Sequence, residues 1–265
     1  MRSDMSKATA VYLYCVVRAA RRPAMARVPA GLPGGTQPSA HQLTPSLWLI
    51  TSDVPIDLYG PEALEPRLRD LDWVSATAVA HEAVVEHFSR TRTVTVVPMK
   101  LFTMFTSLEK AIDDVARGRT AIERIIRRIA GCEEWGIRVM RRPAAAAAQA
   151  DGNGGRPRSG TAFLAARKQA RDATALARAA AAARADQAFT RLRRYAKDAR
   201  LRQHGPEPGS NPPILEAAFL VTAAKVAVFK AEARRQAAAL AAAGADMQLT
   251  GPWPAYNFVD AGERA

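Results

Sequence analysis

Two histidines and two glutamates lie close together in HEAVVEH, residues 81–87, and these residue types can bind a metal ion or move protons. A zinc-protease helix needs HExxH, because histidines four residues apart share one face of the helix. Here His81 and His87 lie about 120° apart around a helix with about 100° per residue. Val85 stands where the second histidine would be needed. The segment therefore predicts no metal site, but one buried and one exposed histidine.

Other sequence patterns typical of enzymes are also missing. The glycine cluster at residues 152–155 precedes neither a Lys-Ser/Thr pair nor a strand-to-helix turn, so it is neither a P-loop nor a dinucleotide fingerprint. There is no GxSxG elbow, and Cys15 and Cys132 belong to no nucleophile motif. A triad assembled from distant residues stays open, since such groups meet only in space. We predict a protein that is not an enzyme and uses no cofactor or metal.

Large aromatic side chains gather in two segments, GPWPAYNF at residues 251–258 and VPMKLFTMF at residues 97–105. The prolines of the first segment stiffen its backbone and reduce the entropy lost when it is ordered. Such a segment can close the core of its own domain or offer a contact surface to a partner, and both alternatives stay open. The candidate partner-binding residues are Trp253, Tyr256, Phe258, Phe102 and Phe105.

The bulk properties indicate a protein that stays inside the cell. The chain has 265 residues, 48% of them hydrophobic, and a formal charge of +13. That charge favours an anionic partner, or it reflects arginines that solvate helix faces. The two cysteines are far apart, which fits a reducing compartment, and we expect Cys15 to be a small buried hydrophobe. The apolar run at residues 10–17 is too short to span a membrane, so no membrane association is expected.

Hydrophobic periodicity predicts alternating strands and helices after a short N-terminal tail. Residues 18–46 should be a loop, and residues 141–158, rich in Ala, Gly, Pro and Arg, a flexible insert. Strands are expected at residues 11–17, 47–54, 94–98, 133–140 and 214–221, and residues 245–259 should be a strand that runs into a turn of prolines and aromatic residues. Helices are expected from residue 61, over 75–89, from 108 to 129, over 159–204 and over 226–243. This order predicts that the second half, with its long alanine-rich helix, is an α+β fold with helices packed on one sheet.

Several residues should shape these helices. Pro61 suits a first helical turn, Ser107 an N-cap, and Gly118 an interruption of the segment that it divides. Gly205 should end the long helix and Gly244 the last one. The residues expected to face the core are Leu64, Leu68, Leu71, Val79, Ala83, Phe88, Ile112, Val115, Ile122, Ile125, Ile126, Ile129, Val226, Phe229, Ala233 and Leu240.

Seven short blocks along the chain form a pattern together: YLYCVV (12–17), LDWVSATAVAHEAVVEHF (71–88), TVVPMKLFTMF (95–105), EEWGIRV (133–139), SGTAFLAARK (159–168), AAFLV (217–221) and LTGPWPAYNFV (249–259). In this order, the blocks resemble the gas vesicle protein F/L (GvpF/GvpL) family. Each block is weak by itself, and their common order makes the resemblance specific over about residues 10–260. Cys15 departs from the family pattern, in which glycine is usual at that position.

The resemblance implies an α+β protein of two domains, residues 1–130 and 131–265, the second similar to a modified ferredoxin-like fold. It implies a gas vesicle assembly protein, a minor structural or chaperone-like factor without catalytic residues. Its expected partners are the small hydrophobic shell protein and other gas vesicle accessory proteins, and its expected location is the gas vesicle within the cytoplasm. Whether the chain is F-like or L-like stays open. The alternative function is a basic nucleic-acid-binding regulator that uses the arginine-rich helix.

Overall fold

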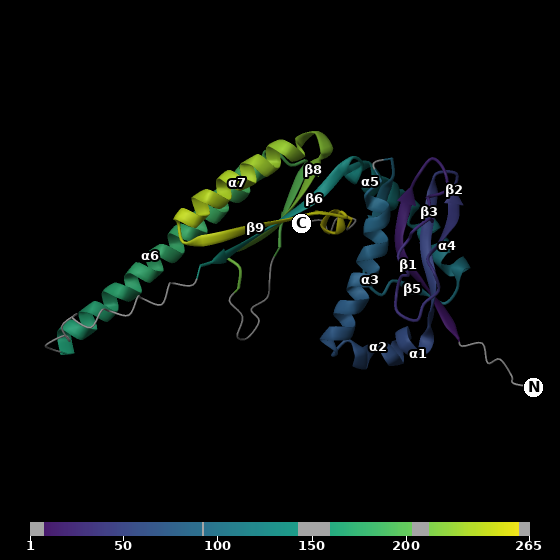
Figure 1. The fold of residues 1–265 in the computed structure, drawn as a ribbon, viewed down its shortest axis with the longest axis horizontal. Coiled ribbons are helices and arrows are strands. Elements are labelled where there is room, and N and C mark those ends of the chain that lie inside the picture. The colour runs from purple at the N-terminus through teal and green to yellow at the C-terminus, as the bar shows by residue number, and fades with distance from the viewer. Residues whose placement is uncertain (1–7, 92, 143–159, 203–211, 260–265) are drawn as a thin grey trace, which may run out of the picture. The chain divides into compact units, whose positions relative to one another are not determined.

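The computed structural model describes residues 8–91, 93–142, 160–202 and 212–259 of the chain (Figure 1). The chain forms two compact units, Met1–Glu133 together with Trp253–Ala265, and Glu134–Pro252. The chain passes from the first unit to the second after Glu133, close to the division predicted at residue 130. However, the end of the chain, from Trp253 on, groups with the first unit. That residues 1–130 and 131–265 are separate folding domains stays a prediction. The predicted flexible insert, apart from residues 141 and 142, lies outside the described residues.

The first unit contains an antiparallel sheet of five strands in the order β2-β3-β1-β4, and β5 also pairs with β1. Its strands are β1 (Thr9–Arg18), β2 (Ser39–Thr44), β3 (Leu47–Pro55), β4 (Thr95–Pro98) and β5 (Met104–Phe105). The strands predicted at residues 11–17, 47–54 and 94–98 are confirmed. Residues 18–46 are not wholly a loop, because β2 pairs with β3 there. The sequence of β2, SAHQLT, is mostly polar, so a search for apolar runs does not predict this strand.

The central strand β1 is covered on both faces, since all seven residues from Val11 to Val17 are buried. A β-bulge shifts its register against β3 between Leu13 and Cys15. An extra residue in a strand changes which alternate side chains point to a given face. Tyr12 before the bulge and Cys15 and Val17 after it therefore belong to the same core cluster. The prediction that Cys15 is a buried hydrophobe is confirmed.

Helices cover this sheet on both sides. Helix α3 (Leu71–Ser89) contacts β1 and β4, α4 (Leu108–Arg117) contacts β1 and β5, and α5 (Arg119–Ile129) contacts β4. Ser107 caps α4 by accepting a hydrogen bond from the backbone N–H of Lys110, and Gly118 separates α4 from α5, both as predicted. The short helices α1 (Ile56–Tyr59) and α2 (Pro61–Arg67) precede α3, and Pro61 occupies the first turn of α2 as expected.

The second unit has the element order β-α-β-β-α-β. Its strands form a four-stranded sheet in the order β7-β8-β6-β9, so the first and third strands are central and the second and fourth lie at the edges. This is the split βαβ arrangement of ferredoxin-like folds. The elements are β6 (Cys132–Arg141), α6 (Gly160–Arg193), β7 (Asp198–Leu201), β8 (Leu215–Thr222), α7 (Val226–Ala242) and β9 (Ala245–Trp253).

The core of this unit lies between the sheet and the two helices. Phe219 on β8 packs against Phe189 on α6 at 5.6 Å and against Phe229 on α7 at 5.3 Å between ring centroids. Ala181, Ala185, Ala188 and Leu192 form the buried stripe of α6, at the spacing that one helix face requires. Phe229, Ala233 and Leu240 of α7 are buried as predicted, and Gly244 after it has a φ of 77°.

Two parts of the predicted helices are wrong. The helix expected over 159–204 ends at Arg193, and Asp198–Leu201 is the edge strand β7, paired with β8. The basic residues of RLRRYAKDARLR are compatible with the end of a helix and with an edge strand. The hydrogen-bonded pairing with β8 makes residues 198–201 a strand. In the first unit, Leu68, Leu71 and Val79 were expected to face the core, but they are 47%, 78% and 67% exposed. The buried residues of α3 are Thr77, His81, Val84, Val85 and Phe88.

Candidate functional site

A buried cluster of tyrosines and a histidine lies between β1 and α3. The Tyr12 hydroxyl is 2.7 Å from Nδ1 of His81, and the Tyr14 ring stacks on the His81 ring at 5.7 Å between centroids. Tyr14 also accepts a hydrogen bond from the backbone N–H of Leu32 and donates one to the Ser52 hydroxyl. Burial raises the pKa of both tyrosines and lowers the pKa of His81 to about 4. These groups are therefore neutral and hold the strand to the helix.

The C-terminal segment completes this cluster. The Tyr256 ring lies 6.2 Å from the His81 ring, and Phe258 is fully buried with the Arg128 guanidinium 6.0 Å from its ring centroid. Burial raises the pKa of Glu82, and burial together with the charge of Glu82 raises the pKa of Tyr256. Three separated sequence blocks, around residues 12, 81 and 256, thus meet in one core.

The metal-site reading of residues 81–87 finds no support in this geometry. His81 is buried against two tyrosines, and the His87 ring contacts the Phe88 ring edge-on at 5.0 Å between centroids. Over residues 8–91, 93–142, 160–202 and 212–259, no group of three or more His, Cys, Asp or Glu side chains could hold a metal ion. Nδ1 of His81 is paired with the Tyr12 hydroxyl, and Glu86 forms an ion pair with Arg90.

A buried acid of the second unit, Glu232 on α7, has both carboxylate oxygens paired. Arg235 donates hydrogen bonds to one carboxylate oxygen, and Gln236 donates to the other at 2.7 Å. The hydrogen bonds from Arg235 lower the pKa of Glu232, against the effect of burial. A carboxylate with both oxygens paired is a structural element and is not available as a general base.

The aromatic candidates of the 97–105 segment belong to the first unit. Phe102 stacks on Trp73 with 5.8 Å between centroids and an interplanar angle of 3°, and Trp73 lies 5.6 Å from Tyr59. We call these three residues the aromatic stack. Phe102 has a φ of 65°, and its backbone N–H donates to the Tyr12 hydroxyl at 3.3 Å, which fixes the loop on the buried cluster. Phe105 pairs with Val11 and is half-buried.

Of the five candidate partner-binding residues, the structure leaves only Trp253 largely exposed, at 46%. Tyr256 and Phe258 pack into the core of the first unit, and Phe102 and Phe105 are half-buried. The segment before Trp253 is held tightly: Gly251 has a φ of 120°, and a Cβ there would lie 2.8 Å from the backbone carbonyl oxygen of Glu134. The candidates therefore do not form one common surface.

Sequence reasoning missed three exposed apolar side chains before and along the first half of α3, Leu68, Leu71 and Val79, which we call the α3 face. Leu71 and Val79 lie about 80° apart on this helix, and Leu68 lies in the turn before it. The only charged residue in the sequence of residues 71–79 is Asp72. The prediction of a buried histidine at position 81 could have revealed these exposed residues. A helix that buries His81, Val84 and Phe88 must expose Val79, which lies on the opposite side.

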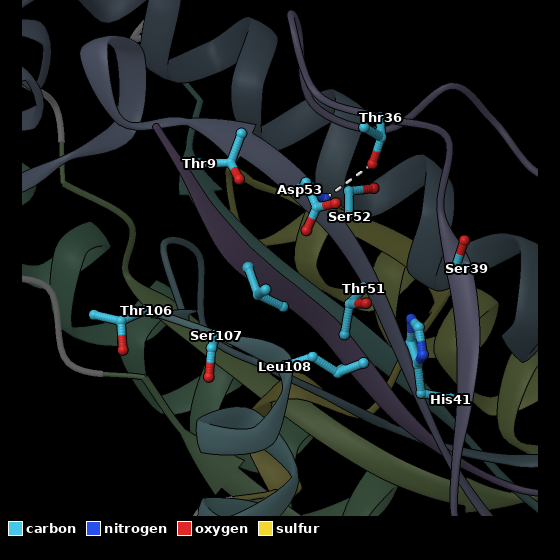
Figure 2. A pocket seen from close by; sticks show the side chains of 11 residues that line it. Thr9, Thr36, Ser39, His41, Thr51, Ser52, Asp53, Thr106, Ser107 and Leu108 are labelled. Carbon is cyan, nitrogen blue, oxygen red and sulfur yellow. Dashed lines mark hydrogen bonds between the residues drawn. The ribbon is translucent and has the colours of Figure 1, made fainter. Parts of the chain in front are cut away.

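A hydroxyl-lined pocket of about 410 Å³ opens on the first unit, beside the sheet and the start of α4 (Figure 2). Thr36 accepts a hydrogen bond from the backbone N–H of Asp53 at 2.9 Å. Burial lowers the pKa of His41, although Asp53 acts in the opposite direction. In the part of the chain that the structure describes, no hydrogen bond joins a pocket hydroxyl to His41. The lining residues are Thr9, Val11, Thr36, Ser39, His41, Thr51, Ser52, Asp53, Thr106, Ser107 and Leu108.

The architecture, an α+β unit followed by a ferredoxin-like unit, matches solved structures of gas vesicle proteins. The crystal structure of the gas vesicle protein GvpF from Anabaena sp. PCC7120 superimposes with a TM-score of 0.64, covering 97% of this chain and 98% of that one at 14% identity. GvpF from Microcystis aeruginosa gives a TM-score of 0.58, with 95% and 99% coverage at 14% identity. At this identity the likeness shows the fold alone.

Sequence comparison identifies the family. Residues 10–260 match the model of the gas vesicle synthesis protein GvpL/GvpF family. The gas vesicle protein L of Streptomyces sp. (strain CB03234) is 30% identical over 266 residues, which cover 95% of this chain and 93% of that protein. The chain therefore belongs to the GvpL/GvpF family, and the resemblance inferred from the seven sequence blocks is confirmed. No helix within the described residues is long and apolar enough to cross a membrane.

Proposed function

We propose that the chain is a non-enzymatic assembly protein of gas vesicles, a minor structural or chaperone-like factor. It binds the small hydrophobic shell protein, together with other accessory proteins, at the vesicle within the cytoplasm. Membership of a family of gas vesicle synthesis proteins supports the general role. The pairing of His81 with Tyr12, and of Glu232 with Arg235 and Gln236, supports a binding role rather than a catalytic one.

The observation that carries this proposal is the exposed apolar face formed by Leu68, Leu71 and Val79. Their side chains are 47%, 78% and 67% exposed. Leaving large aliphatic side chains in water is unfavourable, and exposed apolar side chains that lie along one stretch of helix can be covered by a partner. Leu71 and Val79 lie about two turns apart on α3, so a partner segment running along the helix would contact both. A shell protein with an apolar face is the kind of partner that such a surface would cover, because burying both faces removes apolar area from water.

The aromatic stack gives this face a rigid support. Trp73 follows Leu71 closely on α3, and the Arg67 guanidinium lies 5.5 Å from its ring centroid. The Asp70 side chain accepts hydrogen bonds from the backbone N–H groups of Asp72 and Trp73, which fixes the start of α3. Leu71 therefore stands on a fixed helix end, which lowers the entropy lost on binding.

The proposal is tested by co-expressing the tagged full chain with a gas vesicle shell subunit and washing the captured complex at low and high salt. We expect retention at high salt, because salt strengthens apolar contacts and screens charged ones. The double variant L71S/V79S should lose most of the shell subunit while keeping its far-UV circular dichroism spectrum. The matched control L201S/V228S removes two aliphatic side chains that are 58% and 49% exposed elsewhere.

Retention of the shell subunit by the control but not by L71S/V79S would support the proposal. Equal retention by both variants would show that the α3 face does not bind the shell protein. Release of the shell subunit from the wild-type chain at high salt would show that charge, and not apolar burial, holds the complex.

A further inference from the structure

The outer part of α6 is a helix surface that no described part of the chain covers. All side chains described between residues 161 and 180 are exposed, whereas the buried stripe of α6 begins only at Ala181. Figure 1 shows α6 continuing past the end of α7, the helix on which its C-terminal part packs. At about 1.5 Å per residue the exposed part is about 30 Å long. Its many alanines allow it to stay helical without tertiary contacts.

One side of this outer part is both basic and apolar. At about 100° per residue, Arg167, Arg171, Arg178 and Leu164 fall within about 60° of one another, with Phe163 about 40° beyond Arg167. Phe163 and Leu164 are 52% and 64% exposed. We call these five residues the basic face of α6. The one acid between residues 161 and 180, Asp172, lies about 100° around the helix from Arg171.

No described residue of the chain balances the charges of the basic face. Arg167 and Arg171 are four residues apart, and like charges at that spacing destabilise a helix. Within the described residues, none of the three arginines of this face forms an ion pair. A solvated surface helix would gain from glutamates at these spacings, and α6 has no glutamate. Carboxylates from another molecule would relieve the repulsion.

We propose that the basic face of α6 is a docking surface for an acidic, amphipathic helix of a partner protein. Arginine and aromatic side chains are enriched in protein interfaces, and the face combines both. The alanines around it let the backbone of a second helix approach closely, while acidic side chains of that helix meet the arginines. A second copy of this chain would bring like charges together at the same face, which disfavours self-association through it.

This inference deepens the proposed function and rests on it, because the partner is taken to be another protein of the same assembly. It concerns a different surface from the α3 face. The two can therefore fail separately: L71S/V79S tests binding of the shell protein, and changes in α6 test docking of the acidic helix.

The test uses the full chain and a fluorescein-labelled synthetic helix of about 20 residues, long enough to cover the outer part of α6. The peptide carries a leucine stripe flanked by glutamates, and a matched control peptide has lysines in place of the glutamates. Fluorescence anisotropy measures the dissociation constant. We expect the acidic peptide to bind and the lysine peptide not to bind.

Two variants locate the binding. R167E/R171E/R178E should weaken binding of the acidic peptide at least ~10-fold, because each attraction becomes a repulsion. The control R21E/R22E/R69E changes the net charge equally at exposed arginines of the first unit and should stay within ~2-fold of wild type, because distant exposed charges are screened. F163S/L164S should also weaken binding of the acidic peptide. This variant leaves the charges unchanged, so a weaker binding would show that apolar contacts contribute.

Equal weakening by the two arginine variants would overturn the proposal, since it would show a non-specific charge effect. Tighter binding of a 20-base-pair DNA duplex than of the peptide, lost in R167E/R171E/R178E, would assign the face to nucleic acid instead. Sedimentation of the chain with phosphatidylglycerol vesicles, lost in F163S/L164S, would assign it to a lipid surface. Loss of the shell subunit by R167E/R171E/R178E would place shell binding, and not a separate acidic helix, on α6.

Discussion

Buried neutral His81 should make the first unit sensitive to mild acid. Its pKa falls from 6.5 to about 4 because burial disfavours the charged imidazole. Between these values the unfolded chain binds a proton that the folded chain does not, so the free energy of unfolding falls as the pH falls. Applying the linkage relation between pH 7 and pH 5 gives a loss of about 2 kcal/mol from this one residue. Because His81 is only 3% exposed, screening by solvent reduces this free-energy loss little.

The assay is urea unfolding followed by tryptophan fluorescence at pH 7 and pH 5. Replacing Trp135 and Trp253 by phenylalanine leaves Trp48 and Trp73, which both report on the first unit. In this background His81→Gln lowers stability at pH 7, because the buried ring packs against two tyrosines. It should also remove about 2 kcal/mol of the stability difference between the two pH values.

The comparison of variants isolates His81 from its neighbour. Burial raises the pKa of Glu82, and that carboxyl contributes stability that is lost as the pH rises through its folded-state pKa, the opposite sign to His81. Both proteins keep Glu82, so its effect cancels in the difference. His87→Gln, on the same helix, is the matched control for the replacement of a histidine by glutamine. An unchanged difference between pH 7 and pH 5 in His81→Gln would refute the assignment of a neutral buried histidine.

Three further predictions concern the packing of the chain. Gly251→Ala should cost about 1–3 kcal/mol of stability, because Gly251 has a positive φ and its new Cβ would meet a backbone carbonyl oxygen. Gly244→Ala, where nothing lies within 4 Å, should cost less; both glycines belong to the second unit, so urea unfolding of these variants is followed by far-UV circular dichroism. Asp70→Ala should cost about 1 kcal/mol through loss of the α3 cap, and an unchanged unfolding midpoint would contradict the capping role. Phe258→Ala should cost about 3–5 kcal/mol, whereas Trp253→Ala should leave stability nearly unchanged; equal effects would show that Phe258 does not close the core.

Much of the architecture was predictable from local patterns. The run of apolar and aromatic residues at 11–17 predicts a buried strand, Ser107 predicts a helix start, and Gly118 predicts a break, as observed. These features depend on side chains only a few residues apart, so they can be read locally. The family could also be identified, because seven ordered blocks are specific together even though each is weak.

The polar strands β2 and β7 were not predictable in the same way. SAHQLT and DARL lack an apolar run, and each becomes a strand through its pairing with β3 or β8. The strand β7 is what completes the ferredoxin-like order of the second unit. A strand gains its hydrogen bonds from a neighbour that is distant in sequence, so its own residues carry little of the signal.

By itself, the sequence determined the family, the α+β class and most helices and strands, because periodicity and short blocks are local. Only the tertiary structure decided which face of α3 is buried and where the aromatic residues at the chain end lie. Tyr256 and Phe258 could have bound a partner or closed a core, and their contacts with His81 and Arg128 place them in the core of the first unit. The physical reason is that burial depends on what the rest of the chain brings to a side chain, and those neighbours lie far away in the sequence.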